Sequence, residues 1–235
     1  GQENEETLRF VERTDQEGGL GVVWLECIVN PVHGKGVRHR TVSFKTAARQ
    51  GEPFEAFIAK SGIPNSNKPQ CSDRLKALVI EDYKRSIGWS GCFHAIGIRK
   101  DEERRRAKAA VQVYNLVYPL LDWPTMISDK EDVLNYWEEQ PWSLGLEAHE
   151  GNCKTCWKKS NNKLWLLAVE HPERFEFMAR MERQYSHVKP NENGAPRVFF
   201  RGNRGAVDIL REASSMDSRT LRRMIGADTQ SETGC

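Results

Sequence analysis

A nearly continuous apolar run at residues 22 to 29, VVWLECIV, constrains the fold of this chain more than any other feature. Such a run is typical of a strand that is covered on both faces, as the strands of a parallel sheet are. Further strands are predicted at 93 to 98 and, in shorter form, at 41 to 44. Between them, NPVHGKGVRHR at 30 to 40 predicts a basic loop that contains glycine.

Apolar residues at helical spacing alternate with these strands. Helices are predicted at the start of the chain, around 54 to 60, from Cys71 to near Ser86, at 130 to 139, from Cys156, from His171 to near Arg183 and at 206 to 214, before a polar tail. In the helix at 130 to 139, Val133, Leu134 and Trp137 are expected to point inward. Strands that alternate with helices predict a layered α/β fold.

The charge of the chain argues against a nucleic acid as its principal partner. The 235 residues carry 35 Lys and Arg against 33 Asp and Glu, so the net charge is only +2 and no global basic field exists. Two basic runs, at 104 to 108 and at 154 to 163, are expected to be solvated helix faces, with an anionic ligand as the alternative. No apolar run approaches the ~20 residues of a membrane span and no apolar leader opens the sequence, so we expect a cytoplasmic protein.

The six cysteines indicate thiols or metal ligands rather than a disulfide framework. Cys153 and Cys156 form a CxxC pair beside Lys154, Lys158 and Lys159, which would stabilise thiolates or sulfide. Cys71 is expected at a helix N-terminus, which also favours the thiolate. Cys27 lies in the apolar run and is expected to be a small buried side chain.

These cysteines leave three alternatives: a metal or iron-sulfur site, redox or sulfur-transfer chemistry without a metal, or an inert pair. We expect Cys71, Cys153 and Cys156 to converge on one site. Zinc would need a fourth ligand, for which the residues are Cys92, His94 and His149. A cubane 4Fe-4S cluster held by the three cysteines would leave one iron open to bind sulfur.

Gly97, Arg99 and Arg105 follow the strand predicted at 93 to 98. Ligands of open parallel sheets bind at the carboxyl ends of strands, where a glycine allows close approach and arginines bind phosphate or sulfate. The three residues are therefore predicted to contact a nucleotide. The alternative is a turn with exposed charges.

Five segments, in this order, carry a resemblance that spans nearly the whole chain: GQENEETLRF, CSDRLK around Cys71, GIRKDEERR from Gly97, EGNCKTCWKKS from Glu150 and FFRGNRGAVDIL. Together they resemble the phage and bacterial branch of the phosphoadenosine phosphosulfate reductase family. That family belongs to the adenine nucleotide alpha hydrolase-like superfamily, which includes transfer-RNA thiolation enzymes and DNA phosphorothioation sulfurtransferases. The resemblance implies a three-layer Rossmann-like parallel sheet, with an adenine nucleotide, ATP or phosphoadenosine phosphosulfate, across the carboxyl ends of its strands.

The sequence departs from the family at both ends. The Ser-Gly-Gly phosphate loop that follows the family's first strand does not occur, and Gly1 corresponds to a position just after the second strand. We therefore expect the first strand, the phosphate loop and the first helix to be missing from this sequence. The family's C-terminal nucleophilic cysteine motif is not recognisable around Cys235, so no catalytic residue is assigned.

These features predict a partial nucleotide-binding α/β domain at 1 to 125, a helical segment with cysteines at 126 to 185 and a C-terminal extension at 186 to 235. The expected function is adenine-nucleotide-dependent sulfur chemistry, either sulfonucleotide reduction or sulfur transfer to a nucleic acid or a thiol protein. The alternative is a non-catalytic nucleotide- or nucleic-acid-binding relative with a structural zinc.

Overall fold

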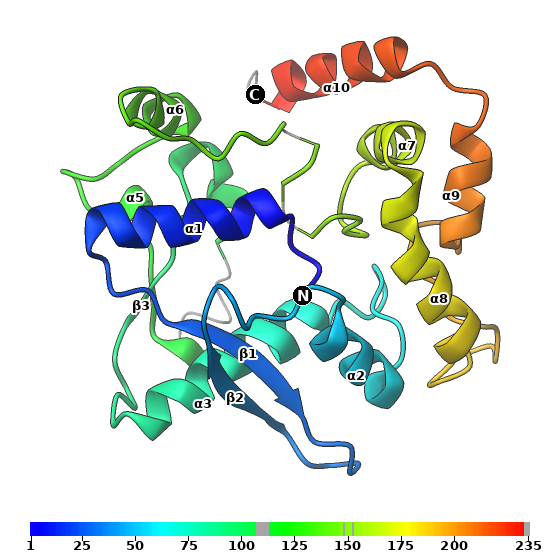
Figure 1. Ribbon diagram of the computed structural model, residues 1–235, viewed down its shortest axis with the longest axis horizontal. Helices are drawn as coiled ribbons and strands as arrows, with labels where there is room; N and C mark the ends of the chain where they lie inside the picture. Colours follow the sequence, from blue (N-terminus) through cyan, green and yellow to red (C-terminus); the bar gives the residue numbers. More distant parts are fainter. Residues whose placement is uncertain (107–112, 148, 152, 233–235) are drawn as a thin grey trace. The chain divides into compact units, whose positions relative to one another are not determined.

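The computed structural model describes residues 1–106, 113–147, 149–151 and 153–232, with side chains as far as Gly226 (Figure 1). The chain forms two compact units. The first contains Gly1–Ile80 together with Gly145–Cys235, and the second contains Glu81–Leu144. The segment predicted at 126 to 185 contributes residues to both units.

Helix α1 (Glu5–Gly18) opens the first unit where the sequence predicted a helix. The Asn4 side chain accepts a hydrogen bond from the backbone N–H of Glu6 and caps the helix. Glu5 and Glu6 lie in the first turn, where negative charge is favourable, and Gly19 ends the helix with a left-handed φ of 58°. The first turn therefore carries the acidic residues that the sequence placed there.

Strands β1 (Trp24–Val29) and β2 (Val37–Val42) form an antiparallel hairpin, in which Trp24 pairs with Val42 and Val29 with Val37. The prediction of a strand at 22 to 29 is confirmed, but its parallel pairing is wrong. The predicted loop at 30 to 40 is shorter than expected, since β2 begins at Val37 rather than at Thr41. The loop at 30–36 allows the chain to return beside β1, which the apolar run alone does not specify.

The main core of the first unit joins segments from both halves of the chain. It packs helix α2 (Glu52–Ser61) with α7 (Asn161–Glu170), the short 3-10 helix η3 (Pro172–Phe175), α8 (Glu176–Tyr185) and α9 (Ala206–Ala213). Its fully buried side chains include Ile58, Leu164, Leu167, Phe175, Met181, Phe199 and Ile209. Complete burial of an aliphatic or aromatic side chain contributes roughly 1.5–3 kcal/mol, so this cluster is the main source of stability.

Helix α10 (Ser218–Glu232) occupies the region predicted to be a polar tail. Leu221 and Ile225 are buried against Leu166 of α7, and these three form a second, smaller core. The helix was missed because its apolar residues are few and widely spaced. Leu221 and Ile225 nevertheless lie four residues apart, which places them on one face.

The second unit contains β3 (His94–Ala95), the 3-10 helix η2 (Lys100–Arg105), β4 (Leu116–Val117), α5 (Pro119–Asp122) and α6 (Lys130–Glu138). Strands β3 and β4 pair in parallel, but they are shorter than the strand predicted at 93 to 98. Helix α6 is present as predicted, whereas Leu134 is 52% exposed instead of pointing inward.

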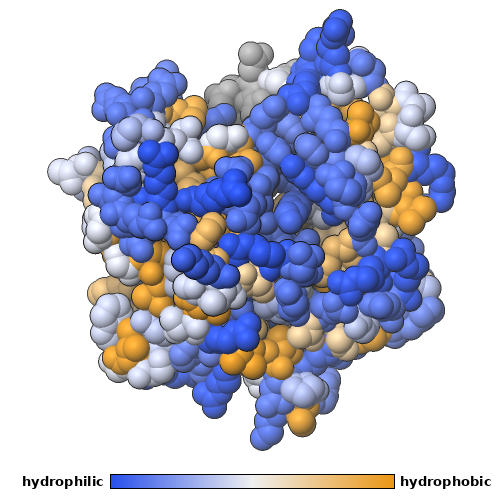
Figure 2. Space-filling view, viewed as in Figure 1, coloured by the Kyte–Doolittle hydropathy of each residue, from blue (hydrophilic) through white to orange (hydrophobic). Residues whose placement is uncertain are grey.

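The described residues thus form a mixed α/β structure with two two-stranded sheets, and they show no larger parallel sheet. On the face that Figure 2 shows, hydrophilic residues predominate and hydrophobic residues occur in separate groups. In the parts of the chain that the structure describes, no helix is long and apolar enough to cross a membrane.

Candidate functional site

Cys71 is the first residue of a long helical segment, as the sequence predicted. The segment continues through a π-helix, η1 (Asp73–Ala77), into α3 (Leu78–Ser86). Cys71 is partly buried and packs against the main core of the first unit. π-Helical turns are rare and occur often at functional sites, so the start of this segment is a place to look for chemistry.

Cys153 and Cys156 lie in a turn that precedes α7 and is not part of it. The backbone N–H of Cys156 donates to Cys153 O over 3.2 Å, and Lys159 N–H donates to Cys156 O over 3.0 Å. The expectation that Cys156 opens a helix is wrong, because Ser160 is the N-cap of α7. The Ser160 side chain accepts a hydrogen bond from the Lys163 N–H, so the helix begins at Asn161, five residues after Cys156.

The start of the chain pairs with this turn. Glu3 forms an isolated antiparallel bridge with Cys153, and Lys154 N–H donates to Gln2 O over 2.8 Å. Cys153 is consequently held between the N-terminal segment and the rest of the turn.

Two of the predicted ligand residues, Cys71 and Cys156, act electrostatically on the third, Cys153. Burial, with smaller contributions from Glu3, Cys156 and Cys71, raises the pKa of the Cys153 thiol to about 11, although Lys76 opposes the change. Cys71 and Cys156 are therefore close enough to Cys153 to influence its titration. At neutral pH the thiol of Cys153 is protonated, so the expectation that neighbouring lysines make it a thiolate is not met here.

Among the lysines around the pair, Lys159 alone is buried. Its Nζ donates hydrogen bonds to His149 O over 2.7 Å and to Gly151 O. Burial lowers the pKa of Lys159 to about 8, while the cysteines of the pair raise it slightly. Lys159 thus ties the segment before Cys153 to the end of the turn.

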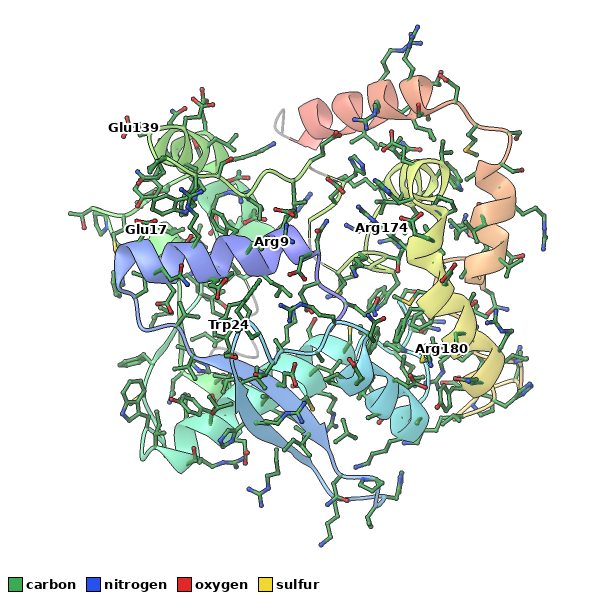
Figure 3. The ribbon with its side chains drawn as sticks, viewed as in Figure 1. Arg9, Glu17, Trp24, Glu139, Arg174 and Arg180 are labelled. Carbon is green, nitrogen blue, oxygen red and sulfur yellow. The ribbon has the colours of Figure 1, made fainter. Side chains whose placement is uncertain are left out.

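One ion pair and two hydrogen bonds from an arginine to the backbone lie on either side of the cysteine pair in the sequence. Arg174, labelled in Figure 3, donates to Glu150 Oε1 over 2.9 Å. Arg201 donates to the carbonyl oxygens of Lys158 and Lys159, both over 3.1 Å. These contacts fix the backbone on both sides of the pair.

His149 forms a further polar cluster beside the turn. Its ring nitrogens lie 3.5 Å from Glu147 and 3.6 Å from Glu170, and Arg222 pairs with both carboxylates. Burial lowers the pKa of His149, while the two carboxylates raise it. Both ring nitrogens of His149 therefore lie beside carboxylates, and neither is directed at the cysteines as in a metal ligand.

The cysteines do not form a ready-made metal site. Among the residues that the structure describes, no three His, Cys, Asp or Glu side chains are arranged to hold a metal ion. Two of the residues considered as a fourth zinc ligand, Cys92 and His94, belong to the second unit.

The predicted nucleotide residues lie in the second unit. Gly97 lies between β3 and η2, and Arg99 forms two hydrogen bonds with Asp101, of 3.0 and 2.9 Å. Arg105 donates to Glu102, which also pairs with Arg99 at 3.5 Å. Both guanidinium groups are therefore bound to carboxylates of η2, with which a phosphate would have to compete.

Two residues near Cys153 were missed by sequence reasoning: Glu3 and Lys76. No sequence signal connects them with the CxxC pair, because each is far from it in the chain. Lys76 follows Cys71 in the same helical segment, so its proximity depends on how that segment packs.

A search against known proteins gives one informative match. The chain is 27% identical over 240 residues to the "Uncharacterized nin region protein ORF290" of Escherichia phage lambda. The match covers 100% of this chain and 80% of the relative. No protein-family model matches the chain, and no solved structure matches it. The comparison therefore relates the chain to a phage protein whose name states no activity.

Proposed function

We propose that this chain belongs to an enzyme of sulfur chemistry that uses an adenine nucleotide, and that Cys71, Cys153 and Cys156 form its sulfur-handling centre. The observation that carries the proposal is the electrostatic influence of Cys71 on Cys153, a residue of a CxxC pair that is distant in the sequence. Thiols brought together from separate segments, in a partly buried site braced by Lys159, suit chemistry in which sulfur is transferred or reduced.

The second unit supports the nucleotide part of the proposal. Strands β3 and β4 are parallel, and Gly97 and Arg99 follow the end of β3. This is where an open parallel sheet binds its ligand. We propose that Gly97, Arg99 and Arg105 contact the phosphates of ATP or phosphoadenosine phosphosulfate, and that the β3–β4 pair is part of a Rossmann-like sheet.

The chemistry available to the cysteines follows from their spacing. At CxxC spacing, Cys153 and Cys156 can pass from two thiols to one disulfide, which releases two electrons and two protons to a substrate. Cys71 provides a third thiol that can exchange with this disulfide. Because the described side chains do not fit a metal, no step is assigned to one.

The test uses protein purified without oxygen. With phosphoadenosine phosphosulfate as the substrate, or ATP with a sulfide donor, we expect turnover that Cys71→Ser, Cys153→Ser and Cys156→Ser each reduce at least 100-fold. Cys27→Ser is the matched control, since Cys27 is buried in β1 with its thiol directed to Arg74 O. It should retain activity.

Metal analysis of the same samples provides the second measurement. One tightly bound zinc per chain, lost in all three variants and accompanied by no nucleotide-dependent turnover, would contradict the proposal and favour a structural-zinc protein. Turnover that persists in Cys71→Ser would also contradict it, because Cys71 would then lie outside the centre.

A further inference from the structure

Residues 27 to 51 form an unusually basic stretch in a chain that is nearly neutral overall. No Asp or Glu occurs between Glu26 and Glu52, although the chain has 33 such residues in 235. The stretch contains five basic residues and two histidines: Lys35, Arg38, Arg40, Lys45, Arg49, His33 and His39. The small net charge of +2 therefore conceals a strongly positive segment.

The structure folds most of this stretch into the β1–β2 hairpin (Figure 1). The hairpin has one carboxylate, Glu26, which is only 9% exposed. Glu26 is occupied by the backbone N–H of Ala48 and by Arg40, whose Nη2 lies 2.5 Å from it. Glu26 therefore balances the charge of Arg40, and the hairpin carries no other carboxylate.

Strand register determines which side chains point outward. Arg38 is opposite Ile28, which is 47% exposed, and Arg40 is on the same face. The alternate residues of β1 include the buried Cys27, whose thiol faces η1. Arg38 and Arg40 therefore lie on the exposed face of the hairpin. The loop at 31–36, in which every residue is exposed, adds Lys35 and His33.

A lysine from α2 holds the loop in shape. Lys60 Nζ donates to Asn30 O over 2.6 Å and to Lys35 O over 2.5 Å, which ties the two ends of the loop together. Gly34 has a φ of 80°, which a glycine adopts without strain. The hairpin is thus ordered before it meets a partner, and this reduces the entropy cost of binding.

We propose that this hairpin binds duplex DNA, with its two strands in the major groove and its basic side chains on the phosphates. A two-stranded β-ribbon fits that groove, and arginine and lysine neutralise phosphates. The hairpin has no acidic side chain on its surface to repel them. This inference does not depend on the proposed function, since it involves neither the cysteines nor a nucleotide.

The test measures fluorescence anisotropy of a labelled 20-base-pair DNA duplex as a function of protein and salt concentration. We expect binding that weakens as salt rises, and Lys35→Glu/Arg38→Glu should reduce affinity at least tenfold. The slope of log K against log salt should decrease by about 2, since about two phosphate contacts are lost. The milder Lys35→Gln/Lys45→Gln should reduce affinity less, and circular dichroism checks that both variants are folded.

The matched control is Arg183→Glu/Arg223→Glu, which changes the net charge equally at exposed positions outside the hairpin. Its affinity should stay within threefold of the wild-type value. An equal loss in both charge-reversal variants would overturn the proposal, because net charge alone would then explain binding. Absence of binding to DNA at 50 mM salt would also overturn it.

Two parallel arms separate other partners. A duplex RNA of equal length should bind more weakly, because its major groove is too deep and narrow for a ribbon. Equal binding to RNA would overturn the placement in the groove. Vesicles containing phosphatidylserine should not bind at the salt concentration where DNA binds, and binding to vesicles alone would reassign the hairpin to an anionic membrane surface.

Discussion

Lys159 shows how burial changes the role of a charged residue. Its neighbour Lys158 is exposed and lies over the Trp157 ring at 5.5 Å, whereas Lys159 is buried and bonds two carbonyl oxygens. The sequence presents the two lysines alike, as counter-charges for thiolates. In the structure, Lys159 organises the backbone that carries Cys153, because its amine has no access to solvent.

The ion pair of Arg174 with Glu150 allows a residue-level prediction. Both side chains are less than a fifth exposed, at 18% and 15%. Burial raises the pKa of Glu150, but the hydrogen bond and charge of Arg174, together with the backbone N–H of Glu147 and the charge of His149, hold that pKa below its usual range. We expect Arg174→Met to lower the free energy of unfolding by about 1–2 kcal/mol at pH 7, measured by urea denaturation.

The pH dependence of this loss follows from the direction of the pKa shift. A lowered carboxylate pKa stabilises the fold above the ordinary glutamate pKa, and the contribution disappears as pH falls through the lowered value. The difference between wild type and Arg174→Met should therefore vanish as the pH falls below that lowered pKa. The exposed Arg183→Met is the control, with a change within about 0.5 kcal/mol at every pH. A loss that persists in acid would mean that Arg174 acts through packing.

At the scale of elements, Gly62 at the end of α2 is a close-approach position. Its φ is 79°, and a Cβ there would overlap the carbonyl oxygen of Val188. Gly194 has the same φ of 79° but nothing within 4 Å of a Cβ. We expect Gly62→Ala to destabilise the protein by roughly 3 kcal/mol or more, and Gly194→Ala by about 1–2 kcal/mol.

Thermal or urea unfolding of the two alanine variants checks this pair. Because both glycines have the same φ, the difference between the variants reports mainly on the close approach at Gly62, above all to Val188. Equal losses would show that the backbone conformation, and not the close approach, makes Gly62 necessary.

The sequence predicts elements well where apolar spacing is regular. The helices that became α1, α2, α6 and α8 were expected from it, and Cys71 begins a helical segment as predicted. The predictions fail where a capping residue sets the start of a helix or where strand pairing sets the topology of a sheet. Ser160 moves the start of α7 beyond Cys156, and the loop at 30–36 turns β1 into a hairpin. A capping residue shifts the end of a helix by only a residue or two, and a pattern of apolar spacing does not resolve so small a shift.

The candidate site was predictable only in part. The cysteines could be named from their spacing and from helix position, but their surroundings could not. The backbone around Cys153 pairs with Gln2 and Glu3, which come from the start of the chain. Long-range pairing of this kind leaves no local pattern in the sequence.

At the scale of the whole molecule, the two units differ in how much they bury. The first unit has the large core of α2, α7, α8 and α9. In the described part of the second, the buried hydrophobic residues are Ile98 and Tyr118, while Phe93 is 76% exposed and Trp89 59%. A unit with so few buried apolar side chains opens at low free-energy cost.

Hydrogen exchange followed by mass spectrometry tests this difference. We expect amides of α7 and α8 to exchange at least ~100-fold more slowly than those of α6, because local opening follows the density of buried contacts. Peptides from α10 provide an internal comparison, since this helix has only the small core with Leu166. Equal protection in α6 and α7 would contradict a weak second unit.

The first unit is assembled from two stretches of chain that the second unit separates. During synthesis, Phe57, Ile58 and Cys71 leave the ribosome before any residue of α7 or α8 exists to cover them. At the usual 5–20 residues per second, the intervening 81–144 segment alone delays their partners by roughly 3–13 s. A nascent chain of this protein therefore exposes part of its future core and an unpaired thiol for seconds. Chaperones and oxidants have access to both during that interval.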